Sequence, residues 1–332
     1  MLLTFRCRFM RRFAAQFLTV IYFLLTSIVS RSQDPHFAGV QDMGIWYNPS
    51  LKTNKVPDAF IKVRSVKYPD IISYSSKVAT IELPFIGRDK DFEDNTFFAN
   101  IAAGISTDKS DDNFMNMSTA MLAFSYAIPL NDDNTCLALG FQGNYTFNKI
   151  GASGNEYFPK GFDKYGALSA AMANDPFQSG YSFGYFTMGA GTSVFHNGEQ
   201  RQWYIGASIR HFNKPYTEWD RAERMPASTG IQAGYTTMVT EKDAIGAYGN
   251  FVWQSRVNEQ LIGIRYSRSF GDSVNNKISL GIGYRNEDAL IPNIDLKLAG
   301  NYFSVFYEFS LHGLKSGNYR RRAFEISYKI NL

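Results

Sequence analysis

The chain ends with the stretch Phe324-Glu325-Ile326-Ser327-Tyr328-Lys329-Ile330-Asn331-Leu332, in which apolar and polar residues alternate without a break. A period of two residues predicts a β-strand with one apolar face and one polar face. A strand at a chain end exposes an edge that promotes aggregation, and pairing it with the first strand to close a barrel removes that edge. The stretch therefore favours a closed barrel.

The same alternation recurs upstream and predicts strands of about nine to eleven residues, the length that a tilted strand needs to cross a bilayer. The clearest examples are residues 136–147, 202–210, 277–285 and 303–311. In each of them large apolar side chains share one face, while small residues such as Gly, Ala and Ser are frequent on the other. Small side chains suit the crowded interior of a barrel better than the water-exposed face of a β-sandwich.

The composition agrees with a barrel in a membrane. Aromatic residues make up 16% of the chain and charged residues 19%, while the mean hydropathy is only −0.24. Lipid-facing and lumenal residues of such strands average out in a hydropathy window. Aromatic residues near strand ends fit girdles at the two membrane interfaces, namely Tyr145, Phe147, Trp203, Trp253, Tyr266 and Tyr284. We expect an all-β protein, a closed antiparallel transmembrane β-barrel of the outer membrane.

The pattern predicts about fourteen strands, centred near residues 63, 78, 101, 121, 141, 187, 206, 232, 248, 264, 281, 295, 306 and 328. Several short connections carry turn residues, as in Asn131-Asp132-Asp133-Asn134, His196-Asn197-Gly198, Gly271-Asp272 and Ser316-Gly317-Asn318. Two connections are long, residues 148–180 and 212–227. Long loops of such barrels usually lie on the extracellular side, where we expect a partner to bind.

Residues 1–32 have the composition of a cleaved signal peptide. Four arginines lie within the first twelve residues, an uncharged run extends from Phe13 to Val29, and small residues follow at Ser30 and Ser32. An uncleaved membrane helix is the alternative, but the run is short for one. We expect cleavage after Ser32, an N-terminal segment over residues 33–58 that lies in the periplasm or plugs the lumen, and a barrel over residues 59–332.

Charge and cysteine content argue against several kinds of partner. The leader holds five of the 34 basic residues and none of the 30 acidic residues, so the mature chain has a formal charge of −1. It therefore has no basic excess to attract nucleic acid. One cysteine, Cys136, remains after cleavage, and it cannot form an internal disulfide or a metal cluster. We expect neither a metal nor a cofactor.

Two groups of residues are candidates for function. The loop over residues 212–227 interleaves charges with aromatic residues, the composition of protein-binding hot spots, and its candidate contacts are Tyr216, Trp219, Arg221 and Arg224. Four charged residues occupy positions that face the predicted lumen, namely Arg210, Arg265, Arg285 and Glu308. They could form the selectivity ring of a pore, or they could pair across the lumen and close it.

The sequence gives little support for catalysis. A Ser–His nucleophile needs a base, an orienting group and an oxyanion site. The histidines of the mature chain are His36, His196, His211 and His312. His211 and Ser208 are three residues apart in a predicted strand, so their side chains point to opposite faces. We expect no catalytic residue.

Several segments share a family pattern in a consistent order along the chain. They are the mature start Gln33-Asp34-Pro35-His36-Phe37, the box Tyr47-Asn48-Pro49-Ser50, and residues 204–215, 283–285, 289–292, 306–309 and 323–327. In these segments the chain resembles the PorP/SprF family, outer-membrane proteins of the type IX secretion system of Bacteroidota. The family's NPAYAG segment is here Asn48-Pro49-Ser50-Leu51-Lys52-Thr53, without its glycine, which indicates a divergent branch.

The resemblance implies a non-enzymatic role in type IX secretion and gliding motility. The leading hypothesis is a barrel in outer-membrane lipid that docks or anchors a large secreted adhesin through its C-terminal domain, or that binds translocon or motor subunits. The alternatives are a passive channel for small solutes and an outer-membrane hydrolase. The sequence leaves open which cargo or subunit binds and whether the lumen is plugged.

Overall fold

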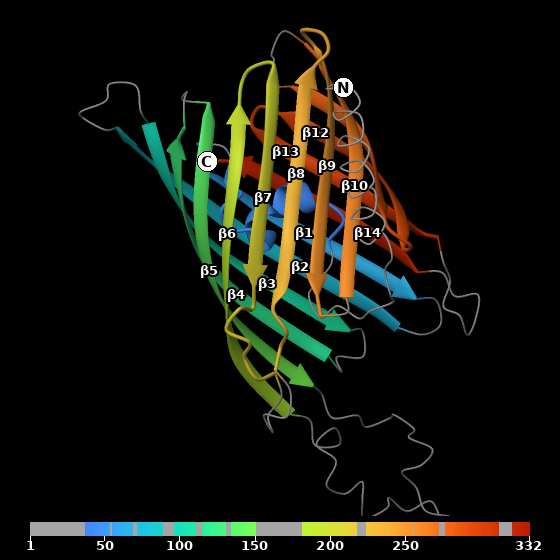
Figure 1. The fold of residues 1–332 in the computed structure, drawn as a ribbon. Helices are drawn as coiled ribbons and strands as arrows, with labels where there is room; N and C mark the ends of the chain where they lie inside the picture. The colour runs from blue at the N-terminus through green and yellow to red at the C-terminus, as the bar shows by residue number, and fades with distance from the viewer. Residues whose placement is uncertain are drawn as a thin grey trace, which may run out of the picture.

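The computed structural model describes residues 37–53, 55–68, 72–88, 96–110, 115–130, 134–150, 181–217, 224–255, 257–271, 276–311 and 321–332. These residues form a closed antiparallel barrel in which each strand pairs with its neighbours in sequence and β1 pairs with β14 (Figure 1). The fourteen strands that they form are β1 (Asp58–Tyr68), β2 (Ile72–Arg88), β3 (Thr96–Ser110), β4 (Met115–Pro129), β5 (Thr135–Ile150), β6 (Tyr181–Asn197), β7 (Arg201–Arg210), β8 (Ser228–Met238), β9 (Asp243–Gln254), β10 (Val257–Ser269), β11 (Lys277–Arg285), β12 (Ala289–Leu298), β13 (Asn301–Ser310) and β14 (Arg322–Asn331). The predicted fold class is confirmed, and every expected strand centre lies within a strand.

Strand β14 closes the barrel as its alternation predicts. Its register against β1 runs from Asp58 opposite Asn331 to Lys67 opposite Arg322, and its other edge pairs with β13. The strand therefore has both edges hydrogen-bonded, which removes the exposed edge.

The two faces of the wall differ as the sequence predicts. Leu280 and Ile282 of β11 are exposed on the outer face, whereas Ser279 of the same strand is buried on the inner face. The same alternation holds in β14, where Phe324 and Ile326 are exposed and Glu325 is buried. An apolar outer face and a polar inner face are typical of a barrel that is surrounded by membrane lipid.

Some strands are longer than the sequence predicts. β2 and β6 have 17 residues each and β5 has 16, against the expected nine to eleven. At roughly 3.3 Å per residue, 17 residues span more than the hydrocarbon core requires. β5 and β6 remain paired up to Ile150 and Tyr181, so this hairpin extends beyond the bilayer. β6 also includes His196 and Asn197, which the sequence assigned to a turn.

The two ends of the barrel differ in their connections. One end carries the start of β1, the end of β14 and short links such as Ala299–Gly300 between β12 and β13. The other end carries the long connections after β5 and β7, which identifies it as the extracellular end. Residues 1–32, Ser316–Asn318 and most of the loop over residues 148–180 lie outside the described residues.

Residues 37–53 lie inside the ring of strands, where Figure 1 shows them in blue. They include the 3-10 helix η1 (Val40–Met43) and the one-turn helix α2 (Gly44–Tyr47). Neither these helices nor any other part of the described chain forms a helix that is long and apolar enough to cross a membrane. We call residues 37–53 the plug segment.

Candidate functional site

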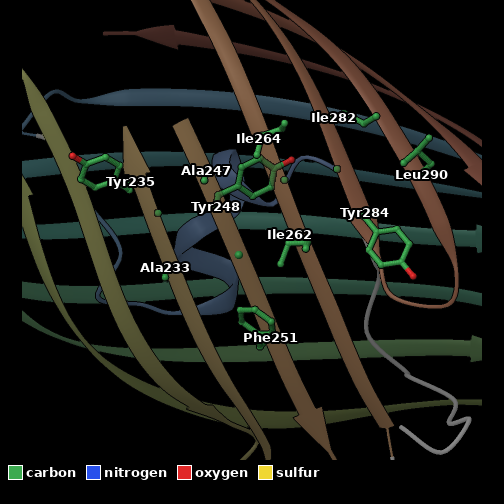
Figure 2. A pocket seen from close by; sticks show the side chains of 14 residues that line it. Ala233, Tyr235, Ala247, Tyr248, Phe251, Ile262, Ile264, Ile282, Tyr284 and Leu290 are labelled. Carbon is green, nitrogen blue, oxygen red and sulfur yellow. The ribbon is translucent and has the colours of Figure 1, made fainter. Parts of the chain in front are cut away.

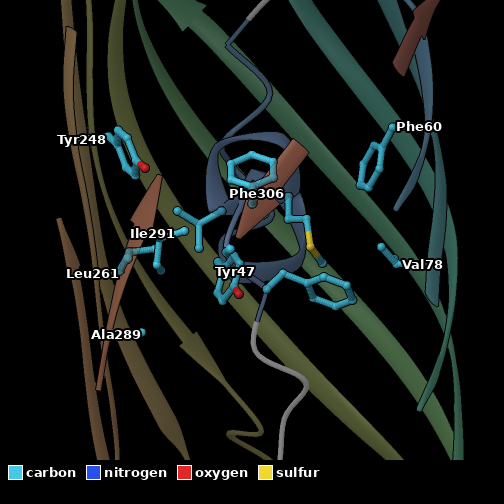
Figure 3. Packing of buried hydrophobic residues seen from close by; sticks show 12 residues of the cluster. Tyr47, Phe60, Val78, Tyr248, Leu261, Ala289, Ile291 and Phe306 are labelled. Carbon is cyan, nitrogen blue, oxygen red and sulfur yellow. The ribbon is translucent and has the colours of Figure 1, made fainter. Parts of the chain in front are cut away.

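The plug segment packs against apolar side chains that point inward from the wall. Phe37 and Ile45 are each 1% exposed, and Met43 and Tyr47 are also buried. Around Phe37, Met43 and Tyr47 the wall contributes one continuous apolar cluster (Figure 3), namely Phe60, Val78, Tyr248, Leu261, Ala289, Ile291 and Phe306. Full burial of a large apolar side chain is worth about 1.5–3 kcal/mol, so this cluster holds the segment in place.

Asn48 anchors the plug segment to the opposite side of the wall. Its side-chain nitrogen donates to the carbonyl oxygen of Ala207 (3.2 Å), to that of Thr192 (3.4 Å) and to Oε1 of Gln232 (3.1 Å). Its side-chain oxygen accepts hydrogen bonds from the backbone N–H and the hydroxyl of Ser50. A buried amide with both ends satisfied fixes the orientation of the turn that carries it.

Three wall glycines make room for this turn. A side chain at Gly191 or Gly206 would run into the amide of Asn48, and one at Gly140 would run into the backbone of Pro49. These glycines belong to the neighbouring strands β5, β6 and β7, so together they form a flat seat. We call Gly140, Gly191 and Gly206 the glycine seat. Glycine permits such close approach of backbone to backbone because it has no side chain.

A buried lysine joins the plug segment to β1 and β14. The ammonium group of Lys62 donates to the carbonyl oxygen of Gly39 (2.6 Å) and lies 3.2 Å from Glu325 and 3.5 Å from Asp42. Glu325 in turn accepts the backbone N–H groups of Ala38 and Gly39 at 2.7 and 2.9 Å. Lys62 is fully buried, and a buried charge needs hydrogen-bonding partners. The plug segment supplies two of them, the carbonyl oxygen of Gly39 and the carboxylate of Asp42.

The electrostatic environment of Asp42 favours its charged form. Burial by itself would raise the pKa of Asp42, but attraction to Lys62 and then Lys329 outweighs it, and the pKa lies below its ordinary value. The ion pair with Lys62 is thus formed at neutral pH.

A second charge cluster holds the C-terminal end of the plug segment. Lys52 lies 2.6 Å from Asp58, the first residue of β1, and 3.5 Å from Glu82 of β2. Lys329 of β14 approaches the same oxygen of Asp58 at 3.0 Å. Because Lys52 and Asp58 are both buried, removing either partner would leave a buried charge, which typically costs about 3–5 kcal/mol.

A third charge cluster lies nearer the extracellular end. Glu308 of β13 is 2.9 Å from Arg64, 3.1 Å from Arg285 and 2.9 Å from Arg321. Asp288 accepts hydrogen bonds from Arg285 and Arg321, which extends the network into the turn between β11 and β12. The network ties β1, β11 and β13 together on the inner face of the wall, and Arg321 adds the residue that precedes β14.

The four predicted lumen charges all lie on inward positions, but the structure brings only two of them together. Arg285 and Glu308 share the cluster described above. Arg265 lies 3.1 Å from Asp295. Arg210 lies 5.7 Å from the ring of Tyr47 and donates to the hydroxyl of Ser228 at 3.3 Å. Arg265 and Arg210 therefore do not contact Arg285 or Glu308 but bind other residues of the wall and the plug segment.

A small cavity of about 70 Å³ separates the plug segment from part of the wall. It is lined by Phe37, Met43, Trp46 and Tyr47 of the segment and by wall residues that include Gln142, Asn144, Arg210 and His211. A cavity of this size holds a few water molecules at most.

The candidate partner-binding loop is described only at its base. Tyr216 and Arg224 form an antiparallel bridge, the guanidinium of Arg224 lies 4.4 Å from the ring centroid of Tyr216, and it donates to the tyrosine hydroxyl at 2.7 Å. Tyr216 is 40% exposed. The two residues therefore present an ordered aromatic–cation pair at the extracellular end. Trp219 and Arg221 lie outside the described residues.

The described histidines make contacts of a structural kind. The ring of His196 stacks on Trp203 and its Nδ1 lies 2.9 Å from the hydroxyl of Thr135. His211 is buried in the turn after β7 with φ of 56°. His36 and His312 lie outside the described residues. Within the described ranges, no group of three or more potential metal ligands occurs.

Sequence reasoning missed several residues of this site. Lys62, Arg64 and Glu325 occupy inward positions of alternating strands, the same signal that identified Arg285 and Glu308. Lys52 and Asp42 lie outside any alternating stretch, so no periodicity marks them.

The family model for "Type IX secretion system membrane protein PorP/SprF" matches residues 73–330, more than half of the chain. A search of curated proteins finds no match.

The solved structures with a similar fold include proteins that are named as transporters and channels. The toluene transporter TbuX of Ralstonia pickettii is 11% identical, with 87% of this chain and 93% of that chain covered and a TM-score of 0.50. The CymD monoaromatic hydrocarbon channel is 10% identical, with 87% and 92% covered and a TM-score of 0.50. A deltaS2S3 mutant of the TodX monoaromatic hydrocarbon channel is 10% identical, with 87% and 94% covered and a TM-score of 0.51. At these identities the likeness concerns the fold alone.

Proposed function

Since the chain belongs to the PorP/SprF family of type IX secretion system membrane proteins, we propose that it is a non-enzymatic outer-membrane barrel that docks secreted cargo or subunits of the secretion machine. The cargo is a large adhesin that is recognised through its C-terminal domain, or the partner is a translocon or motor subunit. The protein acts through its surfaces, and its lumen is not the transport path. In this proposal residues 1–32 are a cleaved leader, residues 33–58 a plug and residues 59–332 the barrel.

The observation that carries the proposal is the filled lumen. Residues 37–53 bond to β7 through Asn48, to β14 through Gly39 and to β1 through Lys52. Strand β7 lies across the ring from the neighbouring strands β1 and β14, so the segment reaches from one side of the lumen to the other, and in this proposal it closes the lumen. A barrel with this interior offers a partner its loops and its outer face.

The exposed Tyr216–Arg224 pair supplies a surface for docking. Tyrosine and arginine dominate the binding energy of many protein interfaces because they combine a large contact area with polar groups. Trp219 and Arg221 belong to the same loop and extend this surface in the proposal. A partner that binds here would present an apolar pocket beside acidic groups.

The passive-channel alternative has weaker support. The three solved structures described above are named as transporters and channels of aromatic hydrocarbons, but they share only the fold with this chain. A channel function would require the plug segment to leave its seat. The hydrolase alternative would require, beside a nucleophile and a base, an acidic group that orients the base, and the described contacts of His196 are the hydroxyl of Thr135 and the ring of Trp203.

Affinity purification from native outer membranes tests the proposal. The full chain, tagged in an extracellular loop, should recover a type IX translocon or motor subunit or a large adhesin in a fixed ratio. Recovery of the barrel alone, together with solute uptake that depends on it, would contradict docking and support the channel.

A further inference from the structure

The outer face of the barrel carries an apolar groove over β8 to β12. Two adjoining hollows of about 630 and 570 Å³ share Tyr235, Ala247, Ile264 and Ile282. Figure 2 shows these side chains on four successive strands, with Ala247 between Tyr235 and Ile264. The hollow of about 570 Å³ extends toward the periplasmic end, past Ile245 and Tyr266. We call the two hollows together the outer groove.

The groove exists because β9 has small residues where its neighbours have large ones. Ala247 and Gly249 occupy successive outward positions of β9, between Ile245 and Phe251. Ile264 on β10 is 61% exposed and Tyr235 on β8 is 45% exposed, so both stand above this floor as ridges. A concave apolar surface of this kind offers a long apolar chain contact on three sides, where a smooth barrel face offers contact on one side.

The periplasmic end of the groove meets a pair of opposite charges. The hydroxyl of Tyr266, which lines the groove, donates to Asp243 at 2.6 Å. Asp243 lies 3.8 Å from the guanidinium of Arg268, which is 61% exposed on the outer face. Thr240 also donates to Asp243, so this carboxylate is fixed in position. Arg268 thus presents a cation at the level where β10 ends.

We propose that the outer groove is a binding site for one phospholipid of the periplasmic leaflet. One acyl chain lies over Ala247 between Tyr235 and Ile264, and the phosphate group pairs with Arg268. The occupant is a lipid because this face of an outer-membrane barrel is surrounded by lipid and because an apolar groove that ends in the Arg268–Asp243 pair matches an acyl chain that ends in a zwitterionic headgroup. Asp243 beside Arg268 also suits the ammonium group of an ethanolamine headgroup.

The test measures lipid retained by the purified barrel. The full mature chain is stripped in detergent, incubated with dioleoyl-phosphatidylethanolamine, and examined by native mass spectrometry. We expect about one retained phospholipid per barrel, and much weaker retention of dioleoylglycerol, which has the same chains without phosphate. Equal retention of the two lipids, or no retention of either, would overturn the assignment.

Two variants separate the groove from the cation. Ala247→Phe fills the groove with a residue that suits a lipid-facing surface, so the barrel should fold and lose the lipid. Arg268→Gln should lower retention about fivefold, the effect of one basic residue near a membrane surface. Ala103→Phe is the matched control, because Ala103 is also exposed on the outer face, in β3.

Folding of each variant is checked by heat-modifiable migration on gels. A folded Ala247→Phe barrel that retains phospholipid as well as the Ala103→Phe control would refute the site. If Ala247→Phe instead removed a stoichiometric protein from the barrel as isolated from membranes, the occupant would be that protein and the lipid assignment would be wrong.

Discussion

The side-chain nitrogen of Asn48 lies 3.2 Å from the carbonyl oxygen of Ala207, and this bond joins the plug segment to a wall strand 159 positions later in the chain. The bond is possible because Gly206, next to Ala207, leaves space for the amide. This anchor of the plug segment therefore depends on the absence of a side chain at Gly206.

Gly206→Ala should loosen the plug segment. A methyl group at this position would lie 2.7 Å from the side-chain nitrogen of Asn48, closer than real side-chain carbons approach. The segment must shift, which weakens hydrogen bonds worth about 0.5–1.5 kcal/mol each. We expect trypsin to cleave after Lys52, which is 3% exposed in the seated segment, at least about tenfold faster.

Gly283→Ala is the control for this experiment. It also lies on the inner face, but the nearest atom to an added methyl is the hydroxyl of Tyr248 at 3.3 Å, and no plug residue is close. Equal cleavage of the two variants would show that the glycine seat does not hold the plug.

The purified wild-type barrel should conduct little or nothing in planar bilayers. The plug segment occupies the lumen and is held by the apolar cluster around Phe37 and by buried ion pairs. Asn48→Ala and Gly206→Ala should each produce brief openings, because they weaken the seat and leave the wall intact. Large, stable conductance of the wild type would refute a sealed lumen and promote the channel alternative.

Acid should weaken the binding of the plug segment to the wall through Asp42. When the plug segment is in place, the pKa of Asp42 lies below its ordinary value of 3.8. The ion pair with Lys62 therefore contributes its full stabilisation at pH values above 3.8, and this contribution is lost as the pH falls through the lowered pKa. Asp42 is one-quarter exposed, so the effect is at most about 1 kcal/mol. Openings should become more frequent below about pH 4, and Asp42→Asn should show a smaller change over that range.

Substitutions in β11 test the assignment of the two faces. Leu280→Arg and Ile282→Arg place a charge on the lipid face near the middle of the strand, which costs roughly 2–4 kcal/mol in such barrels. Ser279→Arg points into the lumen, where its cost includes the hydrogen bond between Ser279 and Ser267 but no transfer into lipid. Assembly, followed by heat-modifiable migration, should be impaired more by the first two changes, and equal effects at all three positions would mean the faces are assigned wrongly.

The fold could be read from the sequence because each strand carries its own signal. Phe324, Ile326 and Ile330 alternate with polar residues within one strand, and the period needs no knowledge of distant residues. The length of β6 could not be read, because pairing of Tyr181 with Ile150 outside the bilayer is decided by the partner strand.

The site was only partly readable for a related reason. Arg285 and Glu308 stand out as charges on inward positions, yet their contact with each other and with Arg321 depends on the curvature of the closed wall. The box around Asn48 is visible as a motif, but its seat is made by Gly191 and Gly206, which are far away in sequence and resemble many other strand glycines. Trp219 remains a prediction.

Loss of the aromatic residues in the candidate loop should weaken partner binding without unfolding the barrel. Truncation of one hot-spot residue can cost about 2 kcal/mol or more, so Tyr216→Ala with Trp219→Ala should lower co-purification of the partner by at least about tenfold. His196→Ala and His211→Ala should change co-purification little. His211→Ala should also introduce mild backbone strain, because φ at this position is 56°.

The most direct test of the docking account is quantitative co-purification from native outer membranes, with the wild type, the Tyr216→Ala/Trp219→Ala variant and the His196→Ala variant compared at equal amounts of folded barrel. The account predicts a type IX translocon or motor subunit or a large adhesin in a fixed ratio with the wild type and with His196→Ala, and its loss from the double variant. If the double variant retains the partner while His196→Ala abolishes secretion, the docking account is wrong and a catalytic role must be reconsidered.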